Sequence, residues 1–249
     1  MNSADWGIEV AKHSRVFKPA GLGPFPVALI FHGCGGKTPF LEDYARTAVA
    51  AGWAAVVVDS LKPRGMSSLD AKLFVCTGVA LHGLKRSADI FAMLAWLESQ
   101  GWADASRVFL AGWSHGGWTI MDGYAVGANA ARATGVADAD PGKLRARVKG
   151  ALLVYPYAGS PSLTSARGWG GGPPIWSVLA GKDQVVGHKL PAKALDRLDR
   201  DGLKVDRVFY ADATHAFDDN KANDPRARYR PDLLSAVQTY FAGALKACG

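Results

Sequence analysis

The sequence contains few cysteines, and their spacing excludes several kinds of site. Cys34, Cys76 and Cys248 are the only three in 249 residues. They lack the paired spacing of a zinc site and are too few for a disulfide framework, so we expect no metal and a reducing compartment such as the cytoplasm. The sequence leaves open whether Cys34 and Cys76 form a bridge.

Long apolar segments are also missing. No stretch reaches the roughly 18 apolar residues that a membrane-spanning helix needs. Residues 1–10 lack the basic and apolar segments of an export signal. We therefore expect a protein that does not associate with a membrane, although an exported protein with a trimmed N-terminus would give the same sequence.

Dense runs of basic residues are absent as well. Lys and Arg (29) outnumber Asp and Glu (22), giving a formal charge of +7, but the basic residues are scattered and mostly accompanied by acids. Without a recognition motif, this pattern indicates a solvated surface and no nucleic-acid partner, with at most a weak attraction for anionic substrates. The oligomeric state is not determined by the sequence.

Short apolar runs alternate with helical patterns along the chain. The runs are typical of buried parallel strands and cover residues 26–31, 53–59, 107–112, 148–155, 175–181 and 205–210. Helical spacing appears at residues 40–51, 86–100, 117–126, 189–200 and 233–246. The alternation predicts an α/β fold with a doubly wound, mostly parallel sheet and helices on both faces. With no repeat or linker, we expect one domain over residues 1–249.

Three segments do not follow the alternation. Residues 7–18 are interpreted as an antiparallel strand at the sheet edge. Residues 63–85 and 157–174 are rich in Gly, Ser and Pro and are predicted to be loops at the carboxyl ends of the strands. Ligands bind at that edge of such sheets, so these loops are expected to border a pocket.

Ser114 stands between glycines where a predicted strand gives way to a predicted helix. The segment reads Gly112-Trp113-Ser114-His115-Gly116-Gly117. This G-x-S-x-G pattern is typical of the sharp turn that exposes a nucleophilic serine, although an ordinary glycine-rich turn gives the same pattern. Ser114 is therefore a candidate nucleophile whose partners must be found elsewhere.

A serine nucleophile needs a base, and the base needs an acid. His215 follows the last predicted strand and is the preferred base, because the side chain of His115 should point away from its neighbour Ser114. Asp183 follows the preceding strand and is the preferred acid; Asp212 and Asp218 are the alternatives. The chain order Ser114, Asp183, His215 is that of α/β-hydrolases.

The glycine-rich turn at residues 32–36 follows the first long predicted strand. Its backbone can face the serine, so the N–H groups of Cys34 and His115 are the expected donors to an oxyanion. A phosphate-binding loop is the alternative, but the P-loop ending and the dinucleotide spacing are both missing. Cys34 as a nucleophile is disfavoured because no base is placed for it.

Aromatic residues near the expected site predict a pocket for small or moderately aromatic esters. The candidates are Trp113, Trp118, Tyr157, Trp169 and Phe217, with core packing as the alternative for each.

Together these motifs resemble the dienelactone hydrolase family of α/β-hydrolases over residues 26–241. They appear in family order: the HGCGG turn, Val58-Asp59-Ser60 with Pro63-Arg64-Gly65, the GWSHGG segment, Gly181-Lys182-Asp183 and Thr214-His215-Ala216-Phe217. The resemblance implies a hydrolase without cofactor or metal, with Ser114, Asp183 and His215 as its triad and Cys34 and His115 as backbone donors.

Three departures bear on the substrate. The lactone-opening members carry cysteine where this chain has Ser114, and glutamate where it has Gly33. They also hold the substrate carboxylate with two arginines; Arg64 approximates one, and Asp219 stands at the other position, where it would repel an anion. The resemblance thus favours a small-molecule ester over a lactone. A lactonase of the carboxymethylenebutenolidase type, a serine peptidase of the same fold and a non-catalytic binding protein are the alternatives.

Overall fold

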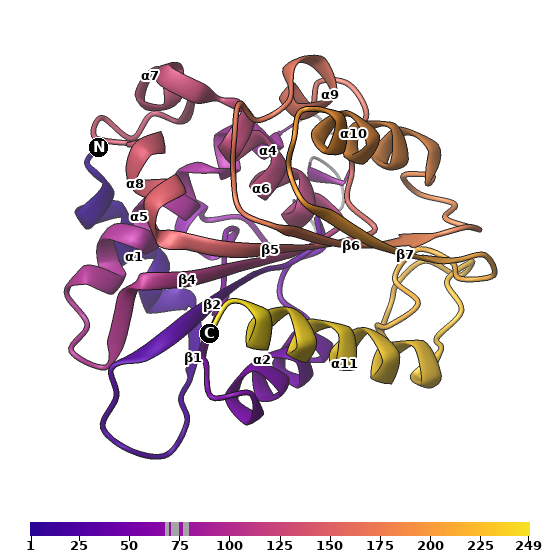
Figure 1. Cartoon of the computed structure of the whole chain (residues 1–249), viewed down its shortest axis with the longest axis horizontal. Coiled ribbons are helices and arrows are strands. Elements are labelled where there is room, and N and C mark those ends of the chain that lie inside the picture. The colour runs from indigo at the N-terminus through magenta and orange to yellow at the C-terminus, as the bar shows by residue number, and fades with distance from the viewer. Residues whose placement is uncertain (68–69, 71–74, 77–79) are drawn as a thin grey trace.

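The computed structural model describes residues 1–67, 70, 75, 76 and 80–249, and its centre is a seven-stranded sheet (Figure 1). The strand order is β1-β3-β2-β4-β5-β6-β7, and all neighbours are parallel except β1 and β3. The strands are β1 Arg15–Phe17, β2 Phe25–Phe31, β3 Ala54–Val58, β4 Ala103–Trp113, β5 Val148–Val154, β6 Ile175–Ala180 and β7 Val205–Tyr210.

The six apolar runs of the sequence are confirmed as β2 to β7. The central strands β2 and β3 are buried on both faces, which explains why their sequences are continuous apolar runs without alternation. The prediction of an α/β fold with a mostly parallel sheet is therefore confirmed.

Helices cover both faces of the sheet. Figure 1 shows α2 and α11 on one face and α1, α5, α6, α8 and α10 on the other. One part of the core joins alternate residues of β2 (Ala28 and Ile30) to α2 and α11, and the other joins Val27 and Leu29 to α5 and α6. The helices are α1 Ser3–His13, α2 Phe40–Ala50, α4 Gly83–Arg86, α5 Ala88–Glu98, α6 His115–Ala125, α7 Ala130–Thr134, α8 Pro141–Arg147, α9 Leu163–Arg167, α10 Lys189–Arg200 and α11 Pro231–Ala247, with 3₁₀ turns at Lys62–Arg64 and Gly127–Asn129.

Among the described residues, none of these helices has the length and apolar character needed to cross a membrane.

The expected edge strand over residues 7–18 is only partly correct. β1 is antiparallel at the sheet edge, as predicted, but it is limited to Arg15–Phe17. Residues before it form α1, which begins where Asn2 accepts a hydrogen bond from the amide of Asp5. The four-residue spacing of Trp6 and Val10 turns both toward the core, which favours a helix over a strand.

The two predicted loops contain short helical turns that the sequence pattern did not indicate. The Lys62–Arg64 turn and most of α4 lie within or beside 63–85, and α9 lies within 157–174. The loop prediction at residues 68–69, 71–74 and 77–79 falls outside the described residues. Helices of three to five residues are too short to produce a readable 3.6-residue period.

Candidate active site

Ser114 occupies the sharp turn between β4 and α6. Its backbone has φ of 51° and ψ of −111°, a conformation that non-glycine residues rarely adopt. Glycine is needed around it: a Cβ on Gly116 would lie 2.2 Å from the carbonyl oxygen of Phe31, and one on Gly112 would lie 2.5 Å from the backbone of Gly116. The tight turn therefore requires the glycines that flank the serine.

Hydrogen bonds connect the side chains of Ser114, His215 and Asp183. Ser114 Oγ lies 3.0 Å from His215 Nε2, and His215 Nδ1 lies 2.7 Å from Asp183 Oδ2. A proton on Nδ1 is donated to the carboxylate, so Nε2 can accept the serine proton. The structure brings together the three residues expected from the sequence, at the carboxyl ends of β4, β6 and β7.

Asp183 is held as a carboxylate. Its Oδ1 accepts hydrogen bonds from the amides of Val185 (2.9 Å) and Val186 (2.8 Å). Burial alone would raise the pKa of Asp183, but the hydrogen bond from His215 and those two amides outweigh it and lower the pKa below its usual value. The carboxyl group is therefore ionised at neutral pH and can orient and stabilise the imidazole.

The alternative acids have other partners. Asp212 is largely exposed and pairs with Lys182 at 2.7 Å. Asp218 lies in the same loop as His215 but is buried, and it accepts hydrogen bonds from Tyr44 (2.8 Å) and from the indole of Trp113 (2.9 Å). Tyr155 also donates to Asp218, and its ring lies 4.6 Å from that of His215. Asp218 thus anchors the loop without contacting the imidazole.

The HGCGG turn lies against the start of α6. Gly116 approaches the carbonyls of Phe31 and His32 closely, as described above. The amide of His115 begins α6 and has no partner within the helix, and that of Cys34 has no backbone acceptor among the described residues. Both amides are available for a ligand.

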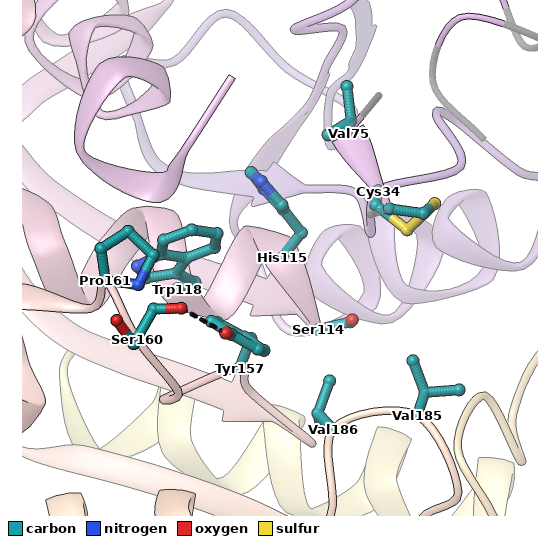
Figure 2. Close-up of a pocket in the computed structure, with 11 residues that line it drawn as sticks. Cys34, Val75, Ser114, His115, Trp118, Tyr157, Ser160, Pro161, Val185 and Val186 are labelled. Carbon is teal, nitrogen blue, oxygen red and sulfur yellow. Dashed lines mark hydrogen bonds between the residues drawn. A yellow bond between two sulfur atoms is a disulfide. The ribbon is translucent and has the colours of Figure 1, made fainter. Parts of the chain in front are cut away.

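A cavity of about 160 Å³ opens beside Ser114. Figure 2 shows Trp118, Tyr157 and Pro161 on one side of Ser114 and Cys34 and Val75 on the other. The remaining lining residues are Cys76, His115, Ser160, Val185 and Val186. None of these described residues carries a carboxylate, ammonium or guanidinium. Burial and the charge of Arg86 hold the pKa of His115 well below its usual value, so this imidazole is neutral too.

Of the aromatic residues expected near the substrate, Trp118 and Tyr157 line this cavity. The other candidates, Trp113, Trp169, Phe217 and Arg64, pack or pair elsewhere. Trp113 and Phe217 belong to the core between the sheet and α11. Trp169 stacks on Tyr124, with ring centroids 4.4 Å apart. Arg64 pairs with Asp89 at 2.9 Å. None of these four residues is among the described residues that line the cavity, and each makes its contacts with the core or with another side chain instead.

Gly33 and Asp219 are the two other positions that the family resemblance connects with the substrate, and only Gly33 lies beside the serine. A Cβ added to Gly33 would lie 3.7 Å from the Cβ of Ser114, so this position faces the serine. Asp219 does not line the cavity among the described residues; it is 8% exposed and accepts a hydrogen bond from the amide of Lys221. Asp219 therefore makes no direct contact with the cavity among the described residues.

The bridge that the sequence left open is present. Cys34 and Cys76 form a disulfide, and both residues line the cavity. Disulfides are rare in reducing compartments, so the cysteine count no longer supports a cytoplasmic location. The bridge ties the HGCGG turn to the segment before α4.

Several residues at the site were not expected from the sequence. Gln184 accepts a hydrogen bond from the amide of His215 at 3.0 Å and so fixes its loop. Val75, Ser160, Pro161, Val185 and Val186 line the cavity without belonging to any motif. No sequence signal marks such residues, since their role comes from loop geometry alone. Among the described residues, no cluster of three or more His, Cys, Asp or Glu side chains could hold a metal ion.

Similar solved structures share this fold. A dienelactone hydrolase from Anabaena variabilis gives a TM-score of 0.63 at 17% identity, with 94% of this chain and 91% of that chain covered. A dienelactone hydrolase-like promiscuous phosphotriesterase from metagenomic libraries gives 0.69 at 17% identity, covering 94% and 92%. Est1E from Butyrivibrio proteoclasticus, with ferulic acid bound, gives 0.63 at 13% identity and covers 94% of each.

A search of curated proteins found no significant match. The model of the dienelactone hydrolase family, by contrast, matches residues 13–244, which is nearly the whole sequence. The chain therefore belongs to the dienelactone hydrolase family.

Proposed function

We propose that the protein is a serine hydrolase that cleaves carboxylic esters through an acyl-enzyme on Ser114. The observation that carries this proposal is the pair of hydrogen bonds that connects Ser114 Oγ to His215 and His215 to Asp183. Ser114 also lines a cavity. Membership of the dienelactone hydrolase family supports the same chemistry.

In the first step, His215 Nε2 takes the proton of Ser114 as Oγ attacks the ester carbonyl carbon. The amides of Cys34 and His115 receive the negative charge on the carbonyl oxygen. The C–O bond to the alcohol then breaks, and His215 gives its proton to that oxygen. Water, activated by the same imidazole, releases the acid and restores Ser114. Asp183 stays ionised throughout.

The cavity favours a small, neutral ester. Its volume of about 160 Å³ is below the range usual for drug-sized ligands, which begins near about 300 Å³. Trp118 and Tyr157 offer apolar faces, and the described lining holds no cation to pair with a substrate carboxylate. An anionic lactone is therefore the poorer substrate. Turnover of p-nitrophenyl acetate should exceed that of an anionic dienelactone, and faster lactone opening would reverse this assignment.

Covalent labelling tests the nucleophile. A fluorophosphonate probe should label the protein, and mass spectrometry of peptides should place the label on Ser114. Ser114→Ala should lose both labelling and hydrolysis of p-nitrophenyl acetate. A wild-type protein that neither reacts nor turns over would favour the non-catalytic alternative.

A matched pair of variants tests the acid. Asp183→Asn leaves the shape of the side chain but removes the charge and the preference for the reactive imidazole tautomer, so kcat should fall by about 10²- to 10⁴-fold. Asp212→Asn removes an exposed carboxylate from the same end of the sheet and should leave kcat within about twofold. Equal losses in both variants would contradict the assignment.

A further inference from the structure

Arg86, at the end of α4, is a charged side chain with no exposed surface. It does not line the cavity, and neither the sequence motifs nor the catalytic steps assign it a role. Burying a guanidinium costs free energy unless hydrogen bonds compensate it. Its partners therefore indicate what it does.

The guanidinium joins three segments that meet behind Ser114. Its Nε donates to Ser60 Oγ at 2.8 Å, just beyond β3. Its Nη1 lies 2.8 Å from the carbonyl oxygen of His32 and 3.1 Å from His115 Nδ1. Because Nη1 carries two hydrogens, it can donate to both acceptors at once.

Two of these contacts fix the backbone that carries the proposed oxyanion donors. His32 lies two residues before Cys34, in the HGCGG turn. His115 itself carries the second donor amide and also presents its ring to Arg86. A single guanidinium therefore connects the turn to the start of α6, the two segments that carry the proposed donor amides.

The charge of Arg86 is not neutralised by direct contact with a carboxylate. Among the described residues it forms no ion pair, and residues 68–69, 71–74 and 77–79 include no Asp or Glu. The nearby carboxylate of Asp89 is occupied by Arg64 and by the indole of Trp6. Burial lowers the pKa of Arg86 to about 9, which still leaves it protonated at neutral pH. Arg86 is therefore charged beside His32 and His115, with the carboxylates of Asp89 and Asp59 nearby but not in contact.

We propose that Arg86 is a positioning residue of the oxyanion hole: it holds the turn at His32 against His115 and places a positive charge, without a direct carboxylate partner, close to the segments that carry both donor amides. This inference rests on the proposed ester hydrolysis. Negative charge develops on the carbonyl oxygen only in the transition state, so both effects stabilise the transition state more than the bound ester. Loss of Arg86 should lower kcat and leave KM nearly unchanged.

The test compares three variants of the whole protein on p-nitrophenyl acetate. Arg86→Met keeps the apolar stem but removes the hydrogen bonds and the charge. We expect kcat to fall by about 30-fold, which is less than the 10²- to 10³-fold loss typical of a missing donor. Arg86→Lys keeps the charge and should recover part of the loss. Arg145→Met is the control, because that guanidinium also binds a backbone carbonyl, of Trp169, but lies away from the cavity.

A second readout separates positioning from general packing. Phenylboronic acid forms a tetrahedral anion on a serine and imitates the transition state, whereas a neutral ester binds in the ground state. Its affinity for Arg86→Met should fall in parallel with kcat, while KM stays within about threefold of wild type. Circular dichroism checks that each variant folds. If Arg86→Met does not fold, Ser60→Ala, which removes only the acceptor of Nε, should show the same pattern with a loss of about threefold.

The outcomes distinguish this inference from the function on which it rests. An inactive and unlabelled wild-type protein overturns the proposed function itself. An active wild type whose Arg86→Met variant folds and keeps wild-type kcat and boronate affinity overturns only the role of Arg86. A variant that loses affinity for ester and boronate equally also overturns it, because a collapsed pocket then explains the loss.

Discussion

Asp122 is a fully buried carboxylate in α6, outside the catalytic groups. It accepts hydrogen bonds from the indole of Trp118 (2.7 Å) and from the amide of Leu163 (2.8 Å). Ser162 Oγ and the amide of Thr164 also donate to it. Asp122 therefore secures both a cavity wall and the loop after β5. Burial raises the pKa of Asp122 to about 6, although these donors oppose the shift.

This raised pKa predicts how stability depends on pH. In the unfolded chain an aspartate titrates near about 3.9, so between pH 4 and 6 the folded protein binds the proton more tightly. The contribution of Asp122 is therefore most favourable below pH 4 and declines as pH rises through 6. The free energy of unfolding of wild type, measured relative to Asp122→Asn, should fall by about 2 kcal/mol from pH 4 to 7. Urea titrations at several pH values measure the unfolding free energies of wild type and Asp122→Asn. A difference between the two proteins that does not change with pH would refute the prediction.

At the scale of elements, the active site depends on how closely α6 approaches β2. Gly116 stands where the first turn of the helix meets the backbone of Phe31 and His32. Backbone atoms cannot move aside as a flexible side chain can. Any side chain at this position must therefore push the helix away from the HGCGG turn.

Two identical substitutions test this contact. Gly116→Ala would place its Cβ 2.2 Å from the carbonyl oxygen of Phe31, so we expect a loss of about 2 kcal/mol or more in unfolding free energy and at least tenfold in kcat. Gly243→Ala in α11 meets nothing within 4 Å and should stabilise by about 0.5–1 kcal/mol, since alanine favours the helix. Urea unfolding and p-nitrophenyl acetate turnover measure both. A tolerated Gly116→Ala would show that the approach is not essential.

At the scale of the whole molecule, the sheet brings together loops that are far apart in the chain. Ser114 and His215 are 101 residues apart, yet their reacting atoms are within hydrogen-bond distance. The disulfide adds a covalent connection between the HGCGG turn and Cys76, which also lines the cavity. It therefore links the stability of the fold to the shape of the site.

Removing the disulfide should lower both the stability of the fold and the activity. The cysteines are 42 residues apart, and closing a loop of this length restricts the unfolded chain by about 4 kcal/mol. The double change Cys34→Ser and Cys76→Ser should lower the unfolding free energy by about 2–4 kcal/mol and reduce kcat, because Cys34 carries a proposed oxyanion donor. Cys248→Ser is the control, since Cys248 is a free thiol near the carbonyl of Lys149. Denaturant titration under non-reducing conditions measures the stability of wild type and of both variants. Equal unfolding free energies for all three proteins would contradict the expectation.

The sequence by itself determined strands β2 to β7, the helices α2, α5, α6, α10 and α11 and the turn that carries Ser114, because apolar runs, helical spacing and glycines are local signals. It did not indicate α1, part of which it assigned to an edge strand. It also indicated His215 and Asp183, since strand order in a parallel sheet places the loops that follow each strand at one edge.

Only the tertiary structure decided which residues line the cavity. Trp113 and Tyr157 are both aromatic residues near the predicted site, but Trp113 packs in the core and Tyr157 lines the cavity. Arg64 and Arg86 are both arginines of the same stretch of sequence, yet Arg64 forms an ion pair with Asp89 and the buried Arg86 binds the turn at His32. Burial and partnership depend on the packing of distant segments, which no local pattern of residues encodes.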